Sequence, residues 1–139
     1  MPGLCTFDYA VIRVVPRVER EEFINAGVIL SCPDRRFLQA RVELDERRLA
    51  ALDPALDAAT VRGYLDTIPL ICAGGAEAGP IGRLPQRARF HWLVAPRSTI
   101  IQTSPVHTGF CDDPEEALER LLASMVRPPG SCSEPSSDG

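Results

Sequence analysis

The sequence predicts a single α+β domain, built from a mainly antiparallel sheet with helices packed on one face. Two observations support this fold class. Three strand-like segments come first in the chain, and a short turn joins the second and third into a hairpin. Helix-like segments follow, then one more strand and a final helix, so strands and helices are grouped and do not alternate regularly.

The three early strands have apolar patterns of two kinds. Residues 6–15 are apolar on both faces, which is typical of a central strand, and residues 26–32 form a second buried run. Residues 37–44 alternate between apolar and polar, and they close the hairpin across the turn at 33–36. The charged stretch 18–23 fits one helical turn between the first two strands.

Helical signals begin at Asp45. Residues 45–52 are predicted to form a short helix, and a second helix capped by Asp57 has apolar residues at helical spacing. Pro69 should kink or end this second helix, because proline lacks the N–H that a helix interior needs. The glycine-rich run 73–82 then predicts a loop.

A last strand and a last helix are predicted in the C-terminal third. The strand lies within residues 90–110, with 98–103 as its core. The helix has a strong start signal, with Asp113 at the cap, Pro114 at the first position and Glu116 three residues after the cap.

Composition limits the class of protein. The 139 residues fit one domain, predicted over residues 1–127, and the Ser, Pro and Gly content of residues 128–139 predicts a disordered tail. No apolar run approaches the roughly 20 residues of a membrane-spanning helix. The N-terminus lacks the basic flank of a signal peptide, so we expect a cytoplasmic protein with no membrane contact. The net charge of -4 argues against a generally cationic nucleic-acid coat.

The five cysteines are odd in number and widely scattered, and no two of them form a C-x-x-C motif. This spacing predicts neither a zinc site nor a disulfide framework, and the sequence indicates no other metal or cofactor. We expect four of them to be small apolar residues of the core or its boundary: Cys5, Cys32, Cys72 and Cys111.

One segment is distinguished by its charge. Between Glu77 and Asp112 there is no acidic residue, and we call residues 78–111 the acid-free window. It carries four arginines, two histidines and several hydroxyl side chains, which are the donors that a phosphate or carboxylate needs. We therefore predict an anion-binding face here, formed by Arg83, Arg89, Arg97, Ser98, Thr99, His107 and Thr108.

Other interpretations of the same residues stay open. The window arginines could pair with the acidic helices at 43–66 and 112–119, or form a protein–protein contact. Trp92 is predicted to be a core anchor more readily than a base-stacking platform. Asn25 and Gly27 are predicted to serve backbone geometry, through a side-chain hydrogen bond to the main chain and a close backbone approach.

Several phrases of the sequence match a known family. They run from Phe7 to Pro16, from Glu21 to Leu30, from Gly82 to Pro85, from Arg89 to Thr99 and from Ser104 to Gly109. Over residues 6–127 the chain resembles the bacterial domain-of-unknown-function family 3037. The resemblance implies a small intracellular bacterial protein, brings no established activity and transfers no catalytic residue. Members are often encoded beside a HipA-like kinase, which implies a possible protein partner.

Three functional hypotheses follow. The first is a non-enzymatic binding or adaptor module that uses the anion-binding face for a phosphate-bearing ligand or a partner protein. The second is an enzyme acting on phosphoesters with His91 or His107 as general acid or base, which requires the two histidines to converge in one pocket. The third is nucleic-acid binding through the same patch, which predicts affinity that falls steeply with salt.

Overall fold

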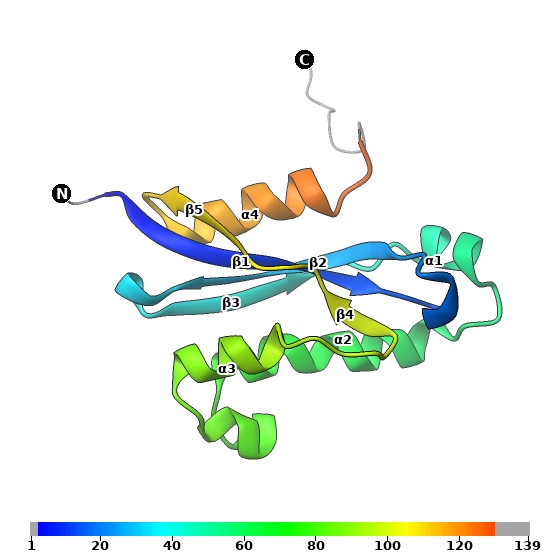
Figure 1. The fold of residues 1–139 in the computed structure, drawn as a ribbon, viewed down its shortest axis with the longest axis horizontal. Coiled ribbons are helices and arrows are strands. Elements are labelled where there is room, and N and C mark those ends of the chain that lie inside the picture. The colour runs from blue at the N-terminus through cyan, green and yellow to red at the C-terminus, as the bar shows by residue number, and fades with distance from the viewer. Residues whose placement is uncertain (1–2, 130–139) are drawn as a thin grey trace.

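The computed structural model describes residues 3–129, so most of the predicted tail lies outside the described residues. Five strands form one antiparallel sheet in the order β3-β2-β1, and the outer edge of β1 pairs with both β4 and β5 (Figure 1). This arrangement confirms the predicted α+β fold with its mainly antiparallel sheet. The strands are β1 Cys5–Val14, β2 Ile24–Cys32, β3 Phe37–Val42, β4 Ile101–Thr103 and β5 His107–Cys111.

The helices cover both faces of the sheet. The α-helices are α1 Glu46–Leu52, α2 Ala58–Ala73, α3 Gln86–Leu93 and α4 Pro114–Met125, and 3-10 turns span Val18–Arg20, Pro33–Arg35 and Ala76–Arg83. Figure 1 shows α2 and α3 below the sheet and α4 above it. Within residues 3–129 no helix is both long and apolar enough to cross a lipid bilayer.

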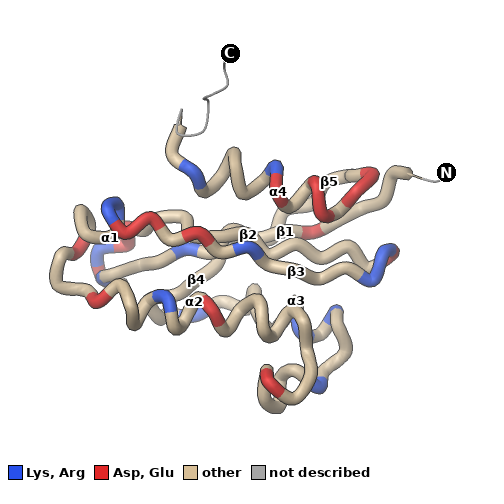
Figure 2. The backbone as a smooth tube through the Cα atoms, turned by 180° about the vertical axis from the view of Figure 1, so that it is seen from behind, with Lys and Arg blue, Asp and Glu red and all other residues tan. Residues whose placement is uncertain are grey.

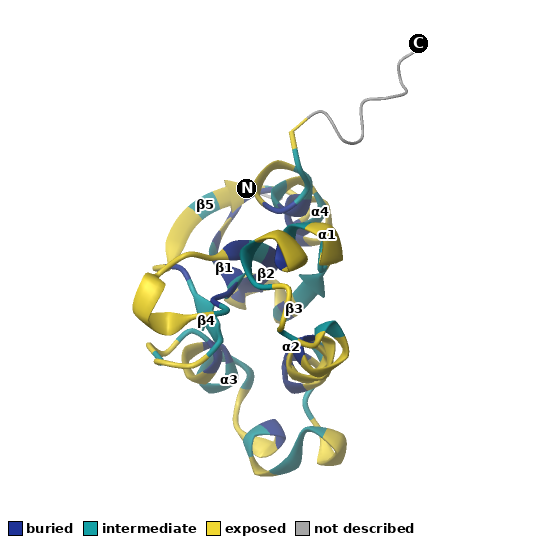
Figure 3. Cartoon of the chain, turned by 90° about the vertical axis from the view of Figure 1, so that its right-hand side faces the viewer, coloured by how far each residue is buried: buried dark blue, intermediate teal, exposed yellow. Residues whose placement is uncertain are grey.

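The expectation that the helices pack on one face is therefore wrong, and the apolar pattern of the two central strands explains why. Along β1, Ile12 and Val14 point into the core between the sheet and helices α2 and α3. Phe7 points to the opposite face, into the core between the sheet and α4. Strand β2 likewise sends Ile29 to the first core and Leu30 to the second. Two buried faces need two layers of helix to cover them (Figure 3).

The junction of β1 and β2 contains the predicted backbone contacts of Asn25 and Gly27. The register between these strands shifts between Ile12 and Arg13. A side-chain carbon on Gly27 would lie 2.5 Å from the backbone oxygen of Arg41, so only glycine fits there. The Asn25 amide donates to the carbonyl of Met125, at 2.9 Å, and fastens the end of α4 to the sheet.

Residues 98–110 form two short strands where one was predicted. Ser104 lies between them and makes two bonds to Val11 of β1: its backbone N–H donates to the Val11 carbonyl at 2.8 Å, and its hydroxyl accepts from the Val11 N–H at 2.9 Å. The buried Ser104 hydroxyl thus replaces a backbone acceptor at the point where the chain passes from β4 to β5.

Between the early and late strands the structure differs from the expected elements at three points. Helix α2 does not end at Pro69 but continues to Ala73, because the buried side chains of Ile68 and Ile71 hold its last turn against the sheet. The glycine-rich run forms the 3-10 turns of Ala76–Arg83 instead of an irregular loop. Residues 90–93, the first part of the range 90–110 in which a strand was predicted, belong to helix α3.

Candidate binding groove

The arginines of the acid-free window are positioned mainly by contacts with the main chain. Arg89 of α3 donates to the carbonyl of Cys72, in the last turn of α2, and to that of Leu84. Arg97 donates to the carbonyls of Trp92 and Leu93 at the end of α3, at 2.6 and 3.0 Å. Cations at helix C-termini satisfy carbonyls that have no partner within the helix.

One window arginine does form an ion pair, with a carboxylate of the sheet. Arg87 of α3 donates to Asp8 of β1 at 2.5 Å and to the hydroxyl of Ser31 at 2.8 Å. Thr108 of β5 also donates to Asp8, at 2.8 Å. Partial burial raises the pKa of Asp8, but the hydrogen bonds from Arg87 and Thr108 outweigh it and hold the pKa below its usual range.

The acidic helices pair with arginines from outside the window. Glu46 of α1 binds Arg62 of α2, and Glu119 of α4 binds both Arg41 and Arg127. Figure 2 shows acidic positions along α4 and around α1, and basic but no acidic positions on α3. The suggestion that the window arginines neutralise the helices at 43–66 and 112–119 is therefore wrong for the described residues.

A largely apolar groove lies between α2, α3 and the segment that leads into β4. Its volume is about 540 Å³, and we call it the Trp92 groove. Leu93 and Ile68 contribute buried apolar surface, while Tyr64 and Trp92 are 51% and 39% exposed. The lining residues are Tyr64, Thr67, Ile68, Ile71, Trp92, Leu93, Arg97, Thr99, Ile100, Ile101, Gln102 and Thr103.

Arg97 and Trp92 form one unit on the wall of this groove. The Arg97 guanidinium carbon lies 4.4 Å from the centre of the indole, within the range of a cation–π contact. Two of its five N–H donors are bonded to the carbonyls at the end of α3, which leaves the others for a ligand. Arg97 is the charged residue among the described lining residues.

The prediction that Trp92 anchors the core is wrong. Its neighbours Phe90 and Leu93 are buried on the inner side of α3, and Trp92 lies on the side that faces the groove. On α2, Val61 and Leu65 are likewise buried, whereas Tyr64 lies on the side that faces the groove. The sequence pattern did not single out either aromatic residue as part of a site, because both lie beside apolar residues at helical spacing.

The structure divides the seven predicted ligand-binding residues among three places. Arg97, Ser98 and Thr99 lie together in the connection from α3 to β4, and two of them line the Trp92 groove: Arg97 and Thr99. Arg83 and Arg89 lie before and within α3, with Arg89 lining a second hollow of about 420 Å³ beside β3. His107 and Thr108 lie on β5.

The two histidines do not converge. On β1, Asp8 and Tyr9 are neighbours and point to opposite faces of the sheet. His91 of α3 lies on the Asp8 side, close enough to help lower the pKa of Asp8. The ring of His107 lies 5.4 Å from that of Tyr9, on the other side. The shared pocket that the phosphoester-enzyme hypothesis requires is absent from the described residues.

The predicted cysteines of the core are buried, and three of them lie together. Cys5, Cys32 and Cys111 have sulfur atoms within 4.8 Å of one another, on the α4 side of the sheet. Burial raises the pKa of Cys32 to about 12 and also raises that of Cys111, so these thiols are protonated at neutral pH. Sequence spacing gave no sign of this cluster, because strand pairing creates it.

Fold and groove together define an α+β protein with two helical layers around an antiparallel sheet and one aromatic groove on the α2–α3 side. The chain matches the family model described as "Protein of unknown function (DUF3037)" over residues 9–126, and it belongs to that family. This confirms the resemblance expected from the sequence. No curated protein matches the chain. No solved structure matches it either.

Proposed function

We propose that the chain is a non-enzymatic binding or adaptor module that takes a segment of a partner protein in the Trp92 groove. An apolar side chain of the partner fills the groove, and an anionic group of the partner binds Arg97. The observation that carries this proposal is the position of two exposed aromatic residues, Tyr64 and Trp92, beside the arginine of one apolar groove.

The composition of the groove supports a protein ligand. Tryptophan, tyrosine and arginine are the residue types that contribute most of the binding energy at protein interfaces. Trp92 is held in place before binding, because Arg97 stacks on its ring and bonds its carbonyl. A contact surface that is already ordered loses less conformational entropy when a partner binds.

The charge of the groove supports an anionic group on that partner. Arg97 has free donors, and the acid-free window supplies no carboxylate that would compete for them. Thr99, whose hydroxyl donates to the Ile101 carbonyl, lies at the same wall. A carboxylate and a phosphate offer the same kind of acceptor oxygens to a guanidinium, so both belong to this proposal.

The HipA-like kinase implied by the family resemblance is the partner that we propose to test. Binding of the purified kinase is measured by calorimetry with the wild-type chain and with Tyr64→Ala and Arg97→Glu. Each substitution should weaken binding at least about tenfold, as expected for central interface residues. Matched controls are Phe110→Ala, an exposed aromatic residue of β5, and Arg120→Glu, an exposed arginine of α4, and both should bind like wild type.

Each result bears on a different part of the proposal. Treating the kinase with a phosphatase separates the two anions: loss of binding assigns a phosphate, and unchanged binding assigns a carboxylate. Binding that survives both groove substitutions would exclude the groove as the site. A kinase that fails to bind the wild-type chain would exclude this partner.

A further inference from the structure

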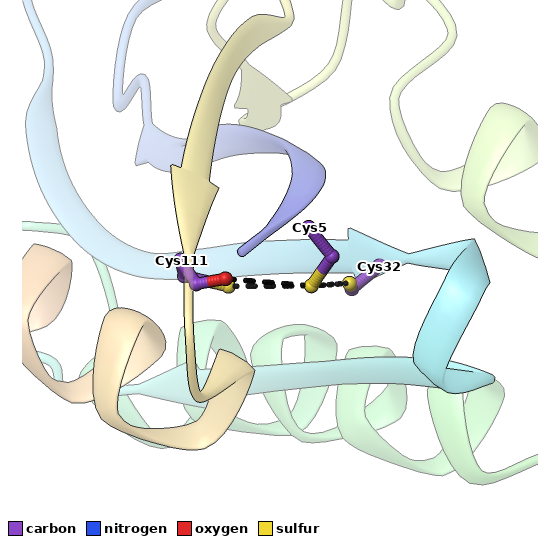
Figure 4. Close-up of side chains that lie close together, drawn as sticks. All are labelled: Cys5, Cys32 and Cys111. Atoms are coloured by element: carbon purple, nitrogen blue, oxygen red, sulfur yellow. Dashed lines mark hydrogen bonds between the residues drawn. The ribbon is translucent and has the colours of Figure 1, made fainter. Parts of the chain in front are cut away.

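Three strand ends bring three thiols together at one end of the sheet. Cys5 begins β1, Cys32 ends β2 and Cys111 ends β5, and we call these residues the cysteine triad (Figure 4). Cys5 and Cys111 are direct partners across the β1–β5 ladder. The sulfur of Cys5 lies 3.1 Å from that of Cys32 and 4.0 Å from that of Cys111. All three side chains are buried.

These separations suit one ion bound between the sulfur atoms. A metal–sulfur bond of about 2.3 Å, as zinc makes, places sulfur ligands roughly 3.8 Å apart in tetrahedral geometry. The distances in the triad lie on both sides of that value, and none exceeds 4.8 Å. Small side-chain rotations therefore suffice to bring all three sulfurs to bonding distance, without a change in the strands.

The donor set favours a soft ion of low coordination number. Within residues 3–129 the group consists of three sulfurs, and no histidine or carboxylate joins it. Structural zinc is almost always held by four ligands, and a water molecule has little access because Cys32 is 0% and Cys5 is 9% exposed. Monovalent copper prefers thiolate ligands, and three sulfurs complete its coordination.

Arg35 places a positive charge beside the cysteine triad. The Arg35 backbone N–H bonds the thiol of Cys32, and the positive charge of its side chain acts on Cys111. The same guanidinium binds the carbonyls of Gly3 and Asp112, just before Cys5 and just after Cys111. If Cu⁺ replaces two thiol protons, the site gains one negative charge, which Arg35 is placed to balance.

We propose that the cysteine triad is a binding site for one Cu(I) ion, held by the sulfurs of Cys5, Cys32 and Cys111. Binding involves no oxidation or reduction: two protons pass from thiols to solvent as two copper–thiolate bonds form, and the third sulfur completes the coordination. The site lies on the α4 face of the sheet, opposite the Trp92 groove, so it stands independently of the proposed function.

The test is an anaerobic titration of the full chain with Cu(I) against the chromophoric chelator bathocuproine disulfonate. All proteins carry Cys132→Ser, so that the titration reports the four described thiols. The chain should retain one Cu(I), and X-ray absorption should show sulfur neighbours alone. Cys111→Ser should weaken binding more than about 100-fold, because even partners outside the ligand sphere change metal affinity 10- to 100-fold.

Cys72→Ser is the matched control, because Cys72 is a buried thiol of α2 in the other core. It should bind Cu(I) like the parent. Near-ultraviolet circular dichroism of each apo protein separates loss of a ligand from loss of folding, and Cys5→Ser provides a second triad variant at the least buried position. Three results would each overturn the proposal: no retained Cu(I), equal loss in Cys72→Ser, or binding of Co(II) with tetrahedral thiolate spectra in place of Cu(I).

Discussion

The Arg87 guanidinium and the Asp8 carboxylate join helix α3 to strand β1 through an ion pair of 2.5 Å. Ser31 accepts from the same guanidinium, and Thr108 donates to the same carboxylate. Asp8 is thus the meeting point of β1, β2, β5 and α3. This cluster fixes the start of α3 on the sheet, and the groove-lining Trp92 is carried by the last turn of the same helix.

The first prediction concerns the pH dependence of stability. Because the folded pKa of Asp8 is lowered below 3.8, its contribution to stability is fully present above about pH 4 and is lost as the pH falls through the folded pKa. Asp8→Asn should cost about 1 kcal/mol at pH 7, a modest value because Arg87 is 40% exposed. Urea unfolding between pH 7 and pH 3 should show the difference from wild type shrinking below pH 4. A difference that stays constant over this range would contradict the assignment.

A second prediction concerns Arg97. Arg97→Ala removes two bonds to the end of α3 and the stacking on Trp92, and it should cost about 1 kcal/mol. Trp92 is the single tryptophan of the chain, so its fluorescence should shift to longer wavelength as water reaches the indole. The control is Arg120→Ala on α4. An unchanged emission spectrum in Arg97→Ala would show that the stacking does not shield the ring.

The third prediction concerns the close packing of backbone around Gly27. Gly27→Ala places a methyl group 2.5 Å from the Arg41 carbonyl and 2.9 Å from the side chain of Ile12, so β2 and β3 must separate. Overpacking of this kind costs about 1–3 kcal/mol. Gly63→Ala is the opposite case, because nothing lies within 4 Å and the site is inside α2. It should raise stability by about 0.5–1 kcal/mol, and thermal unfolding of both variants compares the two effects directly.

The fourth prediction concerns Ser104. Ser104→Ala leaves the Val11 N–H without its acceptor in a buried position, and it should cost about 1–3 kcal/mol. Hydrogen exchange should show faster exchange at the Val11 amide. Ser98→Ala, at an exposed position of the same segment, should leave stability within about 0.5 kcal/mol of wild type. Equal losses of stability in the two variants would show that the hydrogen bond from the Val11 N–H to the Ser104 hydroxyl does not stabilise the fold.

Elements with strong local signals were predictable from the sequence. The two-sided apolar pattern of residues 6–15 placed β1 at the centre of the sheet, where it pairs with β2, β4 and β5. Asp113 caps α4 as predicted, accepting from the Glu115 N–H. Helix α3 was missed because it is short, strongly basic and preceded by glycine-rich turns, so its local pattern is weak without the sheet surface that buries Phe90.

The site was less predictable than the fold, for a physical reason. The absence of acidic residues from the window is visible in the sequence. The direction of each guanidinium is not, because it is set by the carbonyls at the ends of helices, and tertiary packing decides where those helices end. Arg89 and Arg97 bind carbonyls that exist only once α2 and α3 are formed. The cysteine triad is similarly invisible along the chain, since residues 5, 32 and 111 meet only through strand pairing.

The sharing of one edge of β1 between β4 and β5 has a consequence for association between chains. Exposed strand edges are templates for unwanted pairing with other molecules, and proteins protect themselves by keeping such edges short or charged. Here the far edge of the sheet is divided into a three-residue and a five-residue piece, with Pro105 between them. The opposite edge, β3, carries Arg41, which is tied to α4 through Glu119. The divided border therefore offers a neighbouring molecule no long, flat ladder to extend, and the charge of Arg41 disfavours pairing at the opposite border.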